Sequence, residues 1–209
     1  MSDTSKGRAP LNKQSLNDSM KSFFRQHIEK ITPLTDEEFD YVYSHFTHKK
    51  LRKHQFLLEP GDTVINDYFV LSGCLKAYQL DNNGKIHILQ FAMQDWWISD
   101  YQALYKGTKA TIFLDCIEDS EVLVHSVHDR EKLCSELHKM EFFFRKKSNG
   151  GYVALQQRIM SLLTTNASER YEQLLQLYPQ LFQKVPKQLI AAYLGVSRET
   201  LSRLHSEEK

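Results

Sequence analysis

The sequence has no apolar run that approaches the length of a membrane span, and its start, MSDTSKGRAP, lacks the hydrophobic core of a secretory signal. Cysteine is scarce. Cys74, Cys116 and Cys134 are scattered, odd in number and without a CxxC pair, which argues against a disulfide framework and against a cysteine-rich metal site. These absences predict a cytoplasmic protein with no membrane partner.

A strong net charge is also missing, because the formal charge is only +1 at pH 7. Any positive field that attracts nucleic acid must therefore be local. Affinity for DNA would then depend on a dimer, in which two copies share the phosphate contacts. The 209 residues are enough for two modest domains.

No arrangement of residues typical of catalysis is found. Asp95 and Asp100 have no partner acid or histidine that would complete a hydrolase site, so we expect no enzyme activity, no catalytic residues and no cofactor. His45 and His48 are one turn apart in a predicted helix and could share a metal ion, but a solvated helix end is the simpler interpretation. We expect no metal site.

The carboxyl-terminal stretch Lys187–Ser206, KQLIAAYLGVSRETLSRLHS, has the spacing of a helix-turn-helix. Gly195 can adopt the left-handed backbone that the tight turn needs. Ser197 is expected to cap the second helix by accepting a hydrogen bond from the amide of Thr200. The apolar positions that such a unit must bury are Ile190, Ala191, Leu194, Val196, Leu201 and Leu204.

The second helix presents a polar face, with Arg198 beside it and Glu199 and Arg203 on it. Arginine can pair with guanine, and glutamate can accept from the cytosine amino group, so this face suits the major groove. A plain helical hairpin with a solvated outer face is the alternative. The residues predicted to bind DNA are Lys187, Gln188, Ser197, Arg198, Glu199, Thr200, Ser202 and Arg203.

The segment VSRETLSRL resembles the recognition helix of the Crp/Fnr family of bacterial transcription regulators. Ser197, Arg198, Glu199, Thr200 and Arg203 match the positions that this family uses on DNA. The resemblance implies a homodimer that binds double-stranded DNA.

Residues 51–127 have the pattern of short strands separated by turns, which predicts a sandwich or jelly roll. Residues 81–84, Asp-Asn-Asn-Gly, are expected to join strands 75–80 and 85–91 as a hairpin. EPGDTVINDYFVLSGCLKAYQLDNNGKIHILQF resembles the first half of the cyclic-nucleotide-binding β-roll of the same family, and residues 118–123 resemble its closing strand.

The stretch QDWWISDYQALYKGTKATIFL corresponds to the cassette with which that family's nucleotide-binding members hold their ligand. Those members carry Gly-Glu for the ribose and Arg followed by Ser or Thr for the phosphate, and neither pattern is present. Lysine cannot replace the arginine fork, so we expect no tight binding of cyclic AMP. A pocket that could hold an unknown small-molecule effector is predicted from Trp96, Trp97, Tyr101, Lys109 and Thr111. For the aromatic residues among them, packing in the core is the main alternative.

Helical spacing is predicted for residues 20–31, for a helix capped by Thr35 and Glu38, for residues 129–137 and for residues 140–164. In the family the last of these is the dimer helix. We expect Gly150-Gly151 to interrupt this helix. The two glycines could let partner helices approach closely or bend, or they could form a kinked linker between two helices. The predicted apolar seam is Phe143, Phe144, Tyr152, Leu155, Ile159 and Leu162.

A further helix is predicted at 168–177, with a capping box of Asn166 and Glu169. The segment LFQKVP, between this helix and Lys187, is too short for the full strand hairpin that some family members use as a wing.

The predicted fold class is α+β: an amino-terminal β-roll (jelly roll) with flanking helices, a long dimer helix and a carboxyl-terminal, winged-helix-like helix-turn-helix domain. The expected divisions are a mobile amino terminus at 1–19, a sensor domain at 20–139, a dimerisation helix at 140–164 and a DNA-binding domain at 165–209. We expect a transcription regulator; a sensing module with effector-dependent DNA binding is the alternative.

Overall fold

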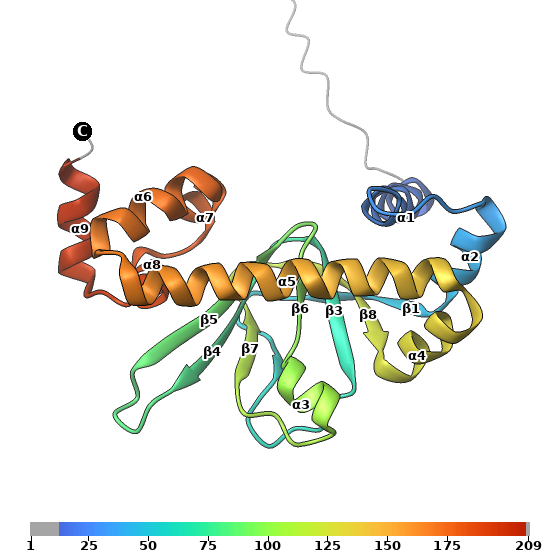
Figure 1. The fold of residues 1–209 in the computed structure, drawn as a ribbon, viewed down its shortest axis with the longest axis horizontal. Helices are drawn as coiled ribbons and strands as arrows, with labels where there is room; N and C mark the ends of the chain where they lie inside the picture. The colour runs from blue at the N-terminus through green and yellow to red at the C-terminus, as the bar shows by residue number, and fades with distance from the viewer. Residues whose placement is uncertain (1–12, 208–209) are drawn as a thin grey trace, which may run out of the picture.

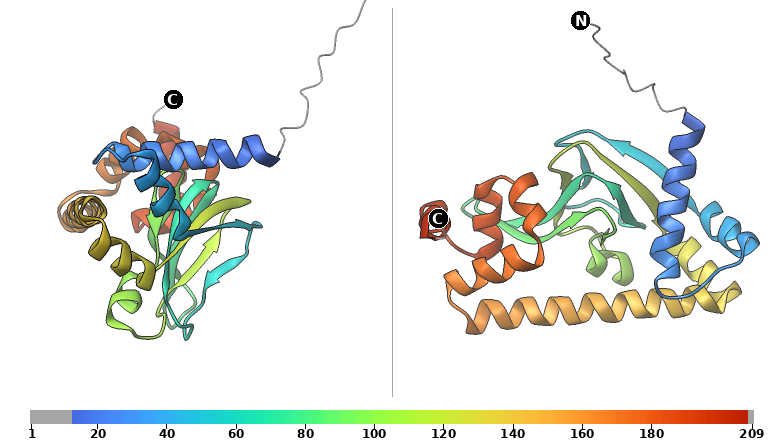
Figure 2. Two further views of the ribbon diagram at one scale, coloured as in Figure 1. Left: turned by 90° about the vertical axis from the view of Figure 1, so that its right-hand side faces the viewer. Right: turned by 90° about the horizontal axis from the view of Figure 1, so that it is seen from above.

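The computed structural model describes residues 13–207 and shows a β-roll lying against one long helix, α5, with a helical head at one end of that helix (Figure 1). Seen from above, α5 runs along one side of the roll, and α1 and α2 lie at the end opposite the head (Figure 2). The head consists of α6, α7, α8 and α9. This arrangement confirms the predicted α+β class.

The roll is a sandwich of two antiparallel four-stranded sheets, ordered β1-β8-β3-β6 and β2-β7-β4-β5. Its inner faces carry apolar side chains from both sheets, and Val70, Leu75, Leu114 and Val122 are completely buried there. Burial of this surface is the main driving force for the sandwich. The strands are β1 (Phe46–Leu51), β2 (Phe56–Leu58), β3 (Asn66–Ser72), β4 (Cys74–Leu80), β5 (Ile86–Met93), β6 (Trp97–Ile98), β7 (Phe113–Cys116) and β8 (Ser120–Ser126).

The predicted hairpin is confirmed, since β4 pairs with β5 around the turn at residues 81–84. The Asp81 amide donates to the Lys85 carbonyl, and Gly84 has a φ of 75° and donates to the Asp81 carbonyl. The turn residues named from the sequence therefore close the strand pair.

Both predicted capping boxes are present. Thr35 and Glu38 cap α2, and Asn166 and Glu169 cap α6, each pair exchanging side-chain and backbone hydrogen bonds. The helices are α1 (Lys13–Glu29), α2 (Asp36–Ser44), α3 (Tyr101–Lys106), α4 (Val127–Glu136), α5 (His138–Thr164), α6 (Ala167–Leu177), α7 (Pro179–Lys184), α8 (Lys187–Leu194) and α9 (Arg198–Glu207). None of the helices in residues 13–207 is long and apolar enough to cross a bilayer.

Three details of the amino-terminal half differ from expectation. Residues 1–19 were expected to be mobile. Residues 1–12 lie outside the described part of the chain, and residues 13–19 belong to α1. The first strand begins at Phe46, so His48 lies in β1 and is not one helical turn from His45. Its Nε2 lies 2.7 Å from Oε2 of Glu121 on β8, which gives it a local partner. The described residues hold no group of three or more potential metal ligands.

The expected interruption of the long helix is wrong. α5 is one continuous helix of 27 residues that passes through Gly150 and Gly151 (Figure 1). It therefore contains no kinked linker between two helices. The anchored end of α5 explains its position, because Met140, Phe143 and Phe144 are buried against α1, α2 and β3.

The head packs on the edge of the roll through a shared apolar core. Ile88 and Phe91 of β5 belong to the same buried cluster as Ile190 and Leu194 of α8. The segment before Lys187 folds as α7, and no strand follows β8 in the part of the chain that the structure describes.

Candidate nucleic-acid interface and cavity

The turn of the predicted helix-turn-helix lies between α8 and α9 and is centred on Gly195. This residue has φ 72° and ψ 29°, the left-handed conformation expected from the sequence. The amide of Val196 donates to the carbonyl of Ala191 at 3.0 Å and closes the end of α8. Ile190, Leu194 and Leu201 are buried between the helices, so the turn is held from both sides by the head's core.

Ser197 caps α9 as predicted from the sequence. Its Oγ accepts a hydrogen bond from the amide of Thr200 at 3.1 Å. Hydrogen bonds from its own backbone amide and from Ser197 lower the pKa of Glu199 below its ordinary value. Glu199 therefore carries a negative charge at neutral pH and can only accept hydrogen bonds.

The polar face of α9 points away from the rest of the head. Arg198, Glu199, Ser202 and Arg203 are exposed, whereas Leu201 between them is buried. Lys187 and Gln188, at the beginning of α8, are also exposed. All eight residues predicted to bind DNA thus lie on the helix-turn-helix, seven of them exposed and Thr200 half-buried.

Arg170 of α6 connects this unit to the long helix. Its Nε donates to the carbonyl of Leu194 at 3.1 Å, and its Nη1 donates to the carbonyl of Thr165. These carbonyls end α8 and α5, where a cation is favoured by the unpaired carbonyl groups. Nothing in the sequence marks this residue, because an arginine in the middle of a helix gives no signal of its partners.

An exposed apolar stripe follows the second half of α5. Tyr152, Leu155 and Ile159 are 70%, 57% and 49% exposed. Phe143 and Phe144, predicted for the same seam, are instead buried inside their own chain, which corrects that part of the prediction. The stripe consists of Tyr152, Val153, Leu155, Ile159, Met160, Leu162 and Leu163.

The cassette around α3 is closed on itself. Asp100 is 3% exposed; its Oδ1 accepts from the amide of Ala103 at 3.1 Å and its Oδ2 from the amide of Thr111 at 2.9 Å. The hydroxyl of Thr111 also donates to Asp100, and Lys109 donates to Thr63. These polar groups hold the loop together, and neither Lys109 nor Thr111 lines the cavity described next.

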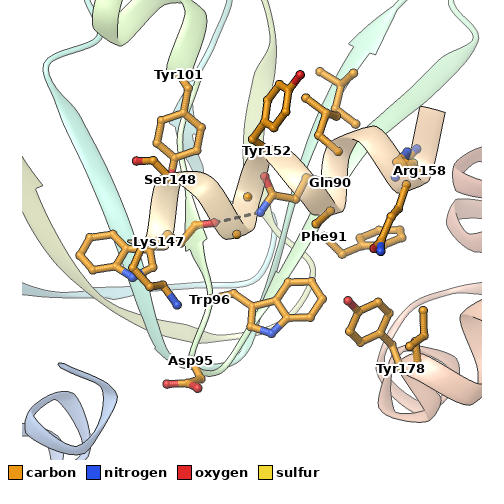
Figure 3. A pocket seen from close by; sticks show the side chains of 18 of the residues that line it. Gln90, Phe91, Asp95, Trp96, Tyr101, Lys147, Ser148, Tyr152, Arg158 and Tyr178 are labelled. Atoms are coloured by element: carbon orange, nitrogen blue, oxygen red, sulfur yellow. Dashed lines mark hydrogen bonds between the residues drawn. The ribbon is translucent and has the colours of Figure 1, made fainter. Parts of the chain in front are cut away.

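A cavity of about 910 Å³ lies between α5, the roll and the head. Trp96, Trp97 and Tyr101, the aromatic residues of the predicted pocket, line it. The ring of Trp96 meets that of Tyr178 of the head with centroids 4.9 Å apart (Figure 3). Trp96 and Trp97 also pack against the apolar cores. These two residues therefore both line the cavity and contribute to core packing.

Behind the cavity-lining Asp95 and Trp97 lies a histidine, His27, with hydrogen bonds at both ring nitrogens. Nδ1 of His27 lies 2.6 Å from Oδ1 of Asp95 and donates to it, while Nε2 accepts from Nε1 of Trp97 at 3.0 Å. Burial, aided by the positive charge of Lys147, lowers the pKa of His27 to about 4. His27 therefore stays neutral at physiological pH and holds α1 on the roll.

A second buried polar cluster joins α4 to β3. Nη1 of Arg130 donates to Oδ2 of Asp67 at 2.7 Å, and Asp67 is 2% exposed. The guanidinium lies 4.1 Å from the centre of the Phe144 ring. Both residues of this ion pair line the cavity.

Arg158 joins the long helix, the roll and the head. Its Nη2 donates to the carbonyl of Ile88 at 2.7 Å and to that of Tyr193 at 3.3 Å, and its guanidinium lies 3.5 Å from the centre of the Tyr193 ring. Nothing in the sequence marks Arg158 either. Its position in a helix with cavity-facing neighbours becomes visible only when the packing of α5 is known.

Comparison with known proteins gives a consistent result. The family model described as cyclic nucleotide-binding domain matches residues 48–136. Among solved structures, FixK2 from Bradyrhizobium japonicum is similar with a TM-score of 0.67 and 19% identity, covering 78% of this chain and 83% of that one. The c-di-GMP-responsive regulator CLP of Xanthomonas campestris has a TM-score of 0.64 and 13% identity, with coverage of 83% and 91%.

The catabolite activator protein of Thermus thermophilus has a TM-score of 0.51 and 20% identity, and 84% of each chain is covered. Comparison with curated protein sequences finds no match. At these identities, the likeness to the solved structures establishes a shared fold.

Proposed function

We propose that this chain, which has a cyclic nucleotide-binding domain within the fold of the Crp/Fnr transcription regulators, is a homodimeric regulator that binds a near-palindromic DNA site. The observation that carries the proposal is the exposed face of α9, where Arg198, Glu199 and Arg203 stand together on a helix that Ser197 caps and the buried Leu201 anchors in the head. A helix presented in this way fits the major groove.

The stripe on α5 supports the homodimer. Seven large apolar side chains along one side of a helix are 45–75% exposed in the single chain. A soluble chain rarely leaves such a continuous patch in water, and a second copy of α5 would cover it. Two heads about one helical turn of DNA apart would then share the phosphate contacts that a chain of net charge +1 cannot supply alone.

We also propose that the roll does not bind cyclic AMP tightly. Both carboxylate oxygens of Asp100 already accept hydrogen bonds from the cassette's own backbone. The residues that precede the two threonines after α3, Gly107 before Thr108 and Ala110 before Thr111, are not arginines, so the Arg-Ser/Thr pair of the nucleotide-binding relatives is missing. A ribose or phosphate group would have to displace bonds that the loop makes with itself.

The first test is selection of duplexes from a random pool at fixed physiological salt, with and without cyclic AMP. A two-fold symmetric site enriched equally in both conditions supports the proposal, and enrichment that requires cyclic AMP contradicts the proposal for the roll. Failure to enrich any sequence contradicts DNA recognition by the free protein.

Two variants measured on the selected site then separate base contacts from phosphate contacts. Arg203→Ala should cost about 1–3 kcal/mol on the selected site and relax the choice at one base pair. Lys187→Ala should weaken binding to all sequences alike and reduce the salt dependence. Equal losses on specific and random DNA for Arg203→Ala would refute its role in base recognition.

The alternative function, a sensing module whose DNA binding depends on an effector, is favoured by the cavity of about 910 Å³, which contacts the roll, α5 and the head together. Enrichment of a DNA site only after a ligand is added would favour it over a regulator that binds DNA without an effector.

A further inference from the structure

On the side of α5 that faces the roll, two small residues lie between two long, positively charged side chains. Lys147, Gly151, Ala154 and Arg158 follow one another at intervals of four, three and four residues and therefore share one face of the helix. All of them line the cavity. Two small residues between two cations leave an opening where large side chains would otherwise fill the space.

The opening at the glycines is real space. A Cβ atom built on Gly150 or on Gly151 meets no heavy atom within 4 Å. Glycine in the middle of a helix costs about 1 kcal/mol relative to alanine, so an uninterrupted helix gains nothing in stability from this pair. Both glycines line the same cavity as Trp96, Gln90 and Tyr178. Figure 3 shows these three side chains.

Lys147 brings a charge without a partner to this space. It is half-buried and makes no hydrogen bond or ion pair with any residue between 13 and 207. The nearest acid, Asp95, is already engaged, because its Oδ1 bonds His27 and its Oδ2 bonds Lys30 at 2.7 Å. Burial accordingly lowers the pKa of Lys147. A partly desolvated ammonium group is stabilised by an anionic acceptor.

Other cations along the cavity are differently placed. Arg130 is paired with Asp67, and Arg170 donates to backbone carbonyls. Arg158 does so through Nη2, while its Nη1 is buried without a partner in residues 13–207. Lys146 is exposed, with its Nζ 5.5 Å from the centre of the Phe142 ring. Lys147 is therefore a half-buried cation that can take an anionic partner without losing an existing bond, and Nη1 of Arg158, further along the same face, is a second donor without a partner among the described residues.

We propose that this cavity binds a small acidic molecule with a flat ring system, whose acidic group pairs with Lys147 and whose ring fills the space beside Gly151 against Trp96. The free amide oxygen of Gln90, whose Nε2 donates to the carbonyl of Trp97 at 2.9 Å, is available to a donor on the ring (Figure 3). Binding at this place does not use Asp100 or Thr111 of the cassette.

The position of the ring connects the ligand with the head. Trp96 belongs to the roll and Tyr178 to the head, and their rings are in contact across one end of the proposed site. A ligand that displaces or extends this contact changes how the head is seated. This consequence for DNA depends on the proposed function, whereas the binding itself does not.

The binding test uses two fluorescent probes without DNA: 1-anilinonaphthalene-8-sulfonate, an aromatic acid, and N-phenyl-1-naphthylamine, its uncharged relative. The wild-type protein should bind the acid at one site per chain and about tenfold or more tightly than the neutral probe. Energy transfer from tryptophan to the bound probe should be efficient, because both tryptophans of the chain, Trp96 and Trp97, line the cavity.

Three variants decide where the probe sits. Lys147→Met should remove the preference for the acid, whereas Arg145→Met, which deletes the same charge from an exposed position outside the cavity lining, should keep it. Gly151→Leu should fill the space and lower the affinity for both probes, and Gly151→Ala should lower it less.

Equal affinity of wild type and Gly151→Leu for the acid, with both proteins folded by circular dichroism, would place the probe away from the space beside Gly151 and overturn the proposal. An unchanged preference in Lys147→Met would overturn the role of that residue. Because DNA is absent from these measurements, their failure is separate from failure of the proposed DNA recognition.

Discussion

The turn of the helix-turn-helix offers a sharp test, because its glycine holds a backbone conformation that other residues adopt with difficulty. Gly195 has φ 72° and ψ 29°. A Cβ added there meets only Leu162 Cδ2, at 3.9 Å, an ordinary contact. Replacing Gly195 by Ala therefore adds backbone strain without a clash, and the expected cost is about 1–2 kcal/mol.

Gly107 is a matched control elsewhere in the chain. It ends α3 with φ 64° and ψ 31°, and an added Cβ there meets no heavy atom within 4 Å. Gly107→Ala should lower stability by the same amount, and both variants should lose about 2–8 °C in Tm. Asn tolerates the left-handed region better than Ala, so Gly195→Asn should recover part of the loss.

The effect on DNA separates the two glycines. In Gly195→Ala, a shift of α9 can release part of the backbone strain. The loss of DNA affinity cannot exceed the strain energy released, so 1.4 kcal/mol of strain limits the loss to about tenfold. Gly107→Ala should leave affinity unchanged. Melting curves and fluorescence anisotropy at fixed salt measure both quantities. A Gly195→Ala protein as stable as wild type, or an equal loss of affinity in Gly107→Ala, would refute the argument.

Two further predictions concern pH and the dimer. The pKa of His27 is about 4 in the folded chain and about 6.5 in the unfolded chain, so the unfolded state binds the proton first and stability falls as pH decreases from 6.5 to 4, by about 3 kcal/mol in total. Urea unfolding at several pH values should show this loss in wild type and not in His27→Gln. Ile159→Glu, at a position 49% exposed, should give a monomer in sedimentation because two like charges would meet across a symmetric seam. A variant that still sediments as a dimer would exclude the stripe as the interface.

Local signals in the sequence were sufficient for most of the secondary structure. The capping boxes at Thr35 and Asn166, the hairpin turn at 81–84 and the glycine turn at Gly195 are all formed as predicted. Each depends on a few adjacent residues with strict backbone requirements, which is why the pattern alone was enough.

The prediction for the long helix was wrong where tertiary packing decides. Gly150 and Gly151 were expected to interrupt α5, but their propensity cost of about 1 kcal/mol each is small compared with the burial of its aromatic end. Phe143 and Phe144 continue the helical spacing of the exposed stripe. Helical spacing alone does not distinguish apolar residues that are buried within their own chain from apolar residues that stay exposed for a second copy.

The cavity could be predicted only in part. An aromatic cluster near residues 96–101 was visible in the sequence, and Trp96, Trp97 and Tyr101 do line the cavity. Lys147 and Arg158 were not found, because their meaning depends on which side of α5 faces the roll. Lys109 and Thr111 were included as polar neighbours in sequence, but their hydrogen bonds to Thr63 and Asp100 hold the loop itself.

The organisation of α5 gives a physical route from ligand to DNA. One end is fixed in the roll by Phe143 and Phe144, one face carries the exposed stripe, and the face with Gly151 borders the cavity before Arg158 reaches the head. A ligand can shift the head only through different contacts in its two positions. The Trp96–Tyr178 ring contact is such a difference, because one ring moves with the head and the other belongs to the roll. In the proposed regulator, occupation of the cavity would therefore act on the orientation of α9 through the contacts that hold the head on the roll, with the anchored end of α5 as the fixed point.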